Sequence, residues 1–225
     1  MPCIVALPDG TFIIMNGAQH GISGFGAADN PNLSALLYDP SQAVGARIST
    51  LNTTTIARMY HSEATLLPDG RVLVSGSDPN PTGKQIYPEE LRIEVYIPPY
   101  LNEGLTQPIV TIQNTYWAYG GRYQITVRLF HGRTSGMRVS LVAATSSTHS
   151  NVMGGRTIFT AFSCSGNNFC TVTAPPDSNV SPPGWYQLFI LDGPTPSHGV
   201  FVRIGGDPAK LGNWPALPGF HLPGI

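Results

Sequence analysis

The stretch from Glu63 to Ser75, Glu-Ala-Thr-Leu-Leu-Pro-Asp-Gly-Arg-Val-Leu-Val-Ser, decides the fold of the first half of this chain. A Pro-Asp-Gly turn separates two β-rich runs, which predicts a hairpin. The same motif occurs one repeat earlier, where Leu7-Pro8-Asp9-Gly10 is followed by the apolar run Thr11 to Met15. Hairpins that recur about every 40 to 60 residues are typical of kelch-like β-propeller blades.

A third strand is predicted from Leu91 to Ile97, where aliphatic residues alternate with polar or aromatic ones. Pro98-Pro99 ends this strand, and Tyr100 to Pro108 is predicted to be a linker, because proline removes a ladder donor and restricts the residue before it. We therefore place a domain boundary near residue 103 and assign residues 1–102 to the last blades of a propeller. A closed propeller usually has about four to eight blades, so we expect missing upstream blades or an associated chain to complete it.

The second half of the chain consists of short alternating segments separated by clusters of Gly, Pro and Asn. About seven strands in roughly 100 residues are typical of an immunoglobulin-like β-sandwich. We assign residues 103–205 to this sandwich and residues 206–225, which are rich in Pro and Gly, to an extended surface tail. The predicted strands are Ile109 to Gln113, Tyr123 to Leu129, Met137 to Ala144, Thr157 to Phe162, Phe169 to Thr173, Trp185 to Leu191 and Gly199 to Ile204.

The composition supports an all-β fold and excludes several classes of partner. Charged residues make up only 11% of the chain, which contains 25 Gly and 21 Pro, so it is rich in turns. A formal net charge of -1 gives no basic face for nucleic acid or an anionic membrane. No apolar run reaches the roughly 20 residues of a membrane span, and Met1 to Val5 does not resemble a signal peptide.

The cysteines and glycosylation motifs favour an extracellular history. Cys164 and Cys170 bracket a short turn-like segment, which predicts either a disulfide across a hairpin or two half-buried free thiols, while Cys3 stands alone. The chain also has few lysines and three glycosylation sequons. The sequons are Asn32-Leu33-Ser34, Asn52-Thr53-Thr54 and Asn179-Val180-Ser181.

Tyr60 and His61, which precede the second hairpin, are candidate metal ligands. Imidazole nitrogen and phenolate oxygen together suit Cu(II). Neighbours on a regular strand point to opposite faces, so the two side chains can share one metal only at an irregular strand start. The alternative is one buried ring and one hydrogen-bonded imidazole. His149, in the polar loop Ser146 to Asn151, is either a third ligand or a surface hydrogen-bonding residue.

Other chemistries have no support in the sequence. There is no phosphate-binding glycine loop, no Cys-x-x-Cys pair and no Gly-x-Ser-x-Gly elbow. The remaining histidines have no ligand-like spacing and are interpreted as ordinary loop or tail residues: His20, His131, His198 and His221.

Several motifs resemble those of one enzyme family. The run from Arg58 to Asn80 and the segment from Asn16 to Gly21 resemble glyoxal oxidases. Glu94 to Leu101, Thr148-His149-Ser150 and Ala174 to Tyr186 are similar to the last blade and the C-terminal early-set sandwich of the glyoxal oxidase/galactose oxidase family of copper radical oxidases. The predicted fold class is therefore all-β, a partial kelch-like β-propeller followed by an immunoglobulin-like (early-set) β-sandwich.

The resemblance implies a copper site and a reaction. It implies one copper held by Tyr60 as the axial phenol, His61 and His149, with Tyr60 also acting as the catalytic base. The expected substrates are small aldehydes or primary alcohols, oxidised by O2 to give H2O2 outside the cell. The family's radical tyrosine, cross-linked to a cysteine, belongs to the upstream segment, and Cys3 does not match that cysteine. The 225 residues alone are therefore predicted to be inactive.

The expected copper ligands come from both predicted domains, and this leads to a geometric prediction. The sandwich loop must reach the propeller axis, so His61 and His149 should lie side by side with Tyr60. Two other hypotheses remain open: a non-catalytic β module that binds carbohydrate or a partner, and a degenerate remnant that does not fold alone.

Overall fold

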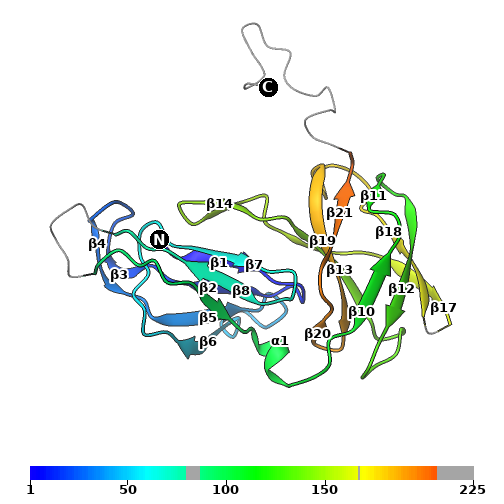
Figure 1. Cartoon of the computed structure of the whole chain (residues 1–225), viewed down its shortest axis with the longest axis horizontal. Coiled ribbons are helices and arrows are strands. Elements are labelled where there is room, and N and C mark those ends of the chain that lie inside the picture. Colours follow the sequence, from blue (N-terminus) through cyan, green and yellow to red (C-terminus); the bar gives the residue numbers. More distant parts are fainter. Residues whose placement is uncertain (80–86, 167, 207–225) are drawn as a thin grey trace, which may run out of the picture.

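The computed structural model describes residues 1–79, 87–166 and 168–206, and their fold is all-β, as predicted (Figure 1). Within this part of the chain, one short helix, α1 (Pro99–Asn102), separates two groups of mainly antiparallel sheets. Most of the predicted tail, residues 206–225, including His221, lies outside the described residues.

The first group contains both Pro-Asp-Gly hairpins. One sheet has the strand order β1-β2-β5-β6, with β1 (Cys3–Ala6), β2 (Phe12–Met15), β5 (Ser34–Tyr38) and β6 (Ile48–Thr53). The next sheet has the order β7-β8-β9, with β7 (Glu63–Leu66), β8 (Val72–Ser75) and β9 (Glu94–Tyr96). A small ribbon pairs β3 (Ala18–Gly21) with β4 (Ala28–Pro31). Alternate residues of the hairpins point into a shared core, as period-two strands require: Val5, Ile13, Leu66, Val72 and Val74.

The second group is a two-sheet sandwich. One sheet has the order β10-β12-β18-β17, with β10 (Ile109–Ile112), β12 (Arg122–Arg128), β18 (Phe169–Thr173) and β17 (Phe162–Ser165). The other has six strands: β11 (Tyr116–Trp117), β21 (Val200–Ile204), β19 (Gly184–Asp192), β13 (Arg138–Ala143), β16 (Thr157–Phe159) and β20 (Thr195–Pro196). Their inner faces pack a core that includes Trp117, Val172 and Leu188.

Three expectations about local structure are corrected. The predicted strand from Thr157 to Phe162 is two strands, because β16 ends at Phe159 and β17 begins at Phe162 on the opposite sheet. The predicted third strand is shorter than expected, since only Glu94–Tyr96 forms β9. The predicted linker contains α1, whose proline is favourable in the first helical turn. Tyr100 on α1 is buried, and its hydroxyl donates to the Gly70 carbonyl at 2.6 Å.

The disulfide hypothesis is confirmed, and the alternative of two free thiols is wrong for this pair. Cys164 on β17 and Cys170 on β18 stand opposite each other in register, with Cα atoms 3.9 Å apart, and form a disulfide. Cys3 is free and buried.

The two halves pack directly against each other. Val142 on β13 and Phe189 on β19 belong to the same core cluster as the blade strands. Both Pro-Asp-Gly hairpins dock on the sandwich: Thr157 Oγ1 donates to the Leu7 carbonyl at 2.9 Å, and the Gly199 amide donates to the Pro68 carbonyl at 2.6 Å. This docking lets a narrow hairpin of the sandwich, β14 (Ser146–Thr148) and β15 (Asn151–Met153), extend toward β1 and β7 (Figure 1).

Candidate metal centre

The three predicted ligand side chains meet at one place. The ring centroids of Tyr60 and His61 are 4.0 Å apart, those of His61 and His149 are 5.6 Å apart, and those of Tyr60 and His149 are 5.8 Å apart. The predicted proximity of two distant sequence segments is therefore confirmed. Among the described residues, no three His, Cys, Asp or Glu side chains gather, so none of the other described histidines joins His61 and His149 in such a group.

The turn before β7 brings the neighbours Tyr60 and His61 to the same side. His61 has a φ of 61°, in the left-handed region, and the Ser62 amide donates to the Met59 carbonyl at 3.3 Å. Ser62 Oγ donates to the same carbonyl at 2.8 Å. Regular strand geometry begins only at Glu63, so this is the irregular strand start that a shared site requires.

His149 lies at the tip of the hairpin β14–β15 rather than in the strandless loop expected from the sequence. The two tip residues, His149 and Ser150, have φ values of 51° and 63°, which is the geometry of a tight primed turn. Such turns usually contain Asn and Gly, so no local sequence signal marks this one.

Backbone strain concentrates at this cluster. The described non-glycine residues with positive φ are Asn16, Asn30, His61, His149 and Ser150. Asparagine and histidine adopt this region more often than most residues, but each non-glycine residue there still incurs a cost of about 1–3 kcal/mol, and such residues gather at functional sites. His61, His149 and Ser150 are the three that are not asparagine. All three belong to the two segments that carry the imidazoles.

The available donors fit copper as an incomplete set. His149 Nδ1 lies 2.8 Å from Thr148 Oγ1, which leaves Nε2 as the free ring nitrogen. Both histidines are exposed, and Tyr60 is half-buried. Two imidazole nitrogens and one phenol oxygen are donors that Cu(II) accepts in tetragonal sites, with further positions left for other ligands.

Several residues around the cluster carry no signal in the sequence. Phe25, 45% exposed, packs near both Tyr60 and His61, with centroid separations of 6.0 and 5.8 Å. Below the cluster, the Cys3 thiol donates to the Ser62 carbonyl at 3.4 Å, and burial raises the pKa of this thiol. Only the folded chain brings these segments together, so no spacing rule could identify them.

Gly76 allows β8 to pass directly behind the His61 turn. It has a φ of 76°, and a Cβ there would overlap the His61 carbonyl oxygen. Gly76→Ala is expected to lower the free energy of unfolding by about 3 kcal/mol, because both the backbone conformation and the close approach are disturbed. Gly45 is the matched control, since it also has positive φ (95°) but no atom within 4 Å of the position that a Cβ would occupy. Urea unfolding should give a loss of about 1 kcal/mol for Gly45→Ala; equal losses would contradict the close-approach argument.

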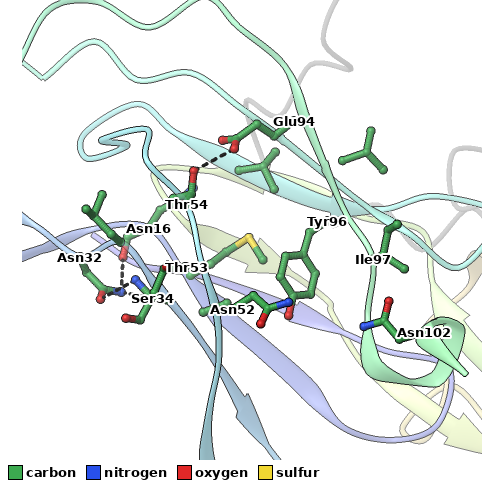
Figure 2. Close-up of a pocket in the computed structure, with 15 residues that line it drawn as sticks. Asn16, Asn32, Ser34, Asn52, Thr53, Thr54, Glu94, Tyr96, Ile97 and Asn102 are labelled. Carbon is green, nitrogen blue, oxygen red and sulfur yellow. Dashed lines mark hydrogen bonds between the residues drawn. The ribbon is translucent and has the colours of Figure 1, made fainter.

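A separate cavity of about 310 Å³ lies between the β1-β2-β5-β6 sheet and the β7-β8-β9 sheet (Figure 2). The rings of Tyr60, His61 and His149 do not line it. Its wall combines the Tyr96 ring with the side chains of Asn52 and Asn102, and Thr54 Oγ1 donates to Glu94 Oε1 at 2.8 Å on one side. Aromatic and amide groups of this kind suit a polyhydroxylated ligand better than a metal ion.

Comparisons with known proteins divide the chain at the same region as α1. Residues 1–100 match the family model described as glyoxal oxidase N-terminus, and residues 107–204 match the model described as galactose oxidase-like, early set domain.

Individual proteins are also similar to this chain. The chain is 57% identical to a WSC domain-containing protein of Arthroderma benhamiae over all of its own length and 24% of that protein. It is 37% identical to an aldehyde oxidase of Vitis pseudoreticulata over 89% of its own length and 40% of that protein. The chain thus spans less than half of these curated relatives. A solved fungal alcohol oxidase in complex with copper aligns with a TM-score of 0.78 at 24% identity, over 90% of this chain and 42% of the other, which shows a shared fold.

Proposed function

This chain belongs to the glyoxal oxidase/galactose oxidase family, and from that premise we propose that it supplies Tyr60, His61 and His149 as ligands of a single copper ion in an oxidase. The observation that carries the proposal is the meeting of two imidazoles, both at left-handed backbone positions, with the phenol of Tyr60, from segments far apart in the chain.

The proposed reaction is a two-electron oxidation by O2. An aldehyde hydrate, RCH(OH)2, and O2 give RCOOH and H2O2, while a primary alcohol, RCH2OH, and O2 give RCHO and H2O2. Bound copper supplies a one-electron redox couple at this position. Tyr60 accepts the proton of the substrate hydroxyl, and the imidazoles of His61 and His149 hold the metal. The names of the plant relatives, aldehyde oxidases, support the aldehyde as substrate class.

The second one-electron acceptor is proposed to come from outside these 225 residues. The free cysteine, Cys3, is buried, and its thiol contacts Ser62 and Ser150. β9 is an edge strand of its sheet, and the side chains of Val95 and, just after the strand, Ile97 line the cavity between the two sheets. We propose that further propeller blades pack against this edge and bring the radical tyrosine, since open sheet edges favour pairing with another strand.

A secreted location is proposed as well. The disulfide between Cys164 and Cys170 is typical of an oxidising compartment, and Asn52 and Asn179 of two sequons are exposed. None of the helices in the described residues is long and apolar enough to cross a membrane.

The second candidate function is a non-catalytic carbohydrate-binding module. The cavity beside Tyr96, with its aromatic ring and amides, supports this alternative. It predicts saccharide binding without any requirement for His61 or His149.

A copper titration tests the proposed function. We expect the 225-residue chain to bind one Cu(II) with nitrogen hyperfine structure in its electron paramagnetic resonance spectrum, because two imidazoles are available. We also expect no H2O2 release from glyoxal, methylglyoxal or galactose after oxidant activation, because a second one-electron acceptor is missing. Absence of Cu(II) binding would contradict the ligand assignment, and turnover that depends on His149 would contradict the missing-cofactor argument.

A further inference from the structure

Glu63 links the two segments that carry the imidazoles. It is the first residue of β7 and follows His61 by two positions. Its Oε2 accepts a hydrogen bond from Ser147 Oγ at 2.5 Å, and its Oε1 accepts one from the Ser150 amide at 3.2 Å. One carboxylate from the blade hairpin therefore binds both sides of His149 on the sandwich hairpin.

The hairpin that carries His149 needs such support. β14 and β15 have three residues each, and they pair only with one another among the described strands. An isolated two-stranded hairpin is marginally stable, and both residues at this tip have unfavourable positive φ. Hydrogen bonds to an ionised carboxylate are stronger than neutral ones, so two of them can hold this tip in place.

A second contact places the tip over the first strand. Ser150 Oγ donates to the Met1 carbonyl at 3.3 Å and lies 3.7 Å from Cys3 Sγ. These contacts are longer and involve neutral groups, so the carboxylate is the principal anchor.

We propose that Glu63 is a positioning residue of the metal centre, which holds His149 against His61 and Tyr60. This inference rests on the proposed copper function. A purely architectural role, in which Glu63 only joins the two halves, predicts a different result: lower stability with unchanged metal coordination.

The test compares the Cu(II) affinity of the wild-type chain with that of three variants, Glu63→Ala, Glu63→Gln and Glu90→Gln. We expect Glu63→Ala to lose about tenfold in affinity, as removal of a supporting residue around a metal typically does, with altered nitrogen hyperfine structure. Glu63→Gln should stay within about threefold of the wild type, because its amide can accept from the Ser150 amide and donate to Ser147 Oγ. The Glu90 side chain is 13% exposed and its carboxylate pairs with Arg92 rather than with the tip residues, so Glu90→Gln should leave affinity unchanged.

Hydrogen exchange of the Ser150 amide, measured without copper, gives an independent result. Exchange should accelerate in Glu63→Ala and remain at the wild-type rate in Glu90→Gln, because only the first variant removes the acceptor.

If the wild type binds no copper, the proposed function fails and this measurement alone decides whether Glu63 holds the tip. If Glu63→Ala does not fold, Ser147→Ala removes one of the two bonds and should give a smaller loss of affinity. Unchanged exchange, or lower stability with unchanged coordination, overturns the proposal.

Discussion

Replacement of His149 by alanine is expected to lower the affinity of the chain for Cu(II) by about 100-fold or more, since loss of a direct ligand should exceed the 10- to 100-fold cost of losing a supporting residue. Only His61 and Tyr60 of the proposed donors would remain, and His61→Ala should have a similar effect. Titration calorimetry would give the affinities, and electron paramagnetic resonance would show the loss of one coordinating nitrogen.

His198→Ala is the matched control for these variants. His198 is also exposed, but its neighbour Gly199 contacts Pro68, in the turn at the opposite end of the β7–β8 hairpin. Its removal should leave the affinity and the spectrum unchanged. Wild-type affinity in His149→Ala would show that copper binds elsewhere, and an equal loss in all three variants would indicate non-specific binding by surface histidines.

Arg58→Met is expected to lower the free energy of unfolding by about 3 kcal/mol, because a buried charged side chain with several hydrogen-bond partners is removed. The Arg58 side chain is 1% exposed. Its Nε donates to Glu94 Oε2 at 2.8 Å, and its terminal nitrogens donate to the carbonyls of Gly76 and Arg92. Methionine fills much of the volume but leaves these acceptors without their donor. Since Glu94 is 33% exposed, water compensates for part of the loss at that carboxylate.

Thermal unfolding should show this loss as a decrease in midpoint of roughly 6–12 °C. Arg92→Met is the control, because the Arg92 side chain is 69% exposed and pairs with Glu90 on the surface, where ion pairs contribute little. Its backbone carbonyl, which accepts from Arg58, is unchanged. Similar midpoints for the two variants would show that burial of Arg58 does not matter. Copper affinity should also fall in Arg58→Met, because Arg58 anchors the start of the Met59–Ser62 turn.

Local sequence patterns predicted much of the architecture. The Pro-Asp-Gly turns with flanking alternation predicted β1–β2 and β7–β8, and the short separation of Cys164 and Cys170 identified the disulfide as one of two options. These features depend on neighbouring residues, so they can be read from a short window. Local patterns did not predict the break between β16 and β17. The alternation of apolar residues continues where the chain passes from one sheet to the other, so it does not mark that point.

The sequence by itself determined the all-β class, the two hairpins and the candidate donors Tyr60, His61 and His149. The family resemblance also led to the prediction that these donors meet. The tertiary structure alone decided that His61 and His149 adopt left-handed backbone conformations, and that Phe25, Cys3 and Glu63 surround them. The physical reason is that hairpins form from local turn and strand preferences, whereas this site exists only where a sandwich hairpin docks on a blade. Such docking depends on packing and hydrogen bonds between segments far apart in the chain. The periodicity of neighbouring residues does not predict these contacts.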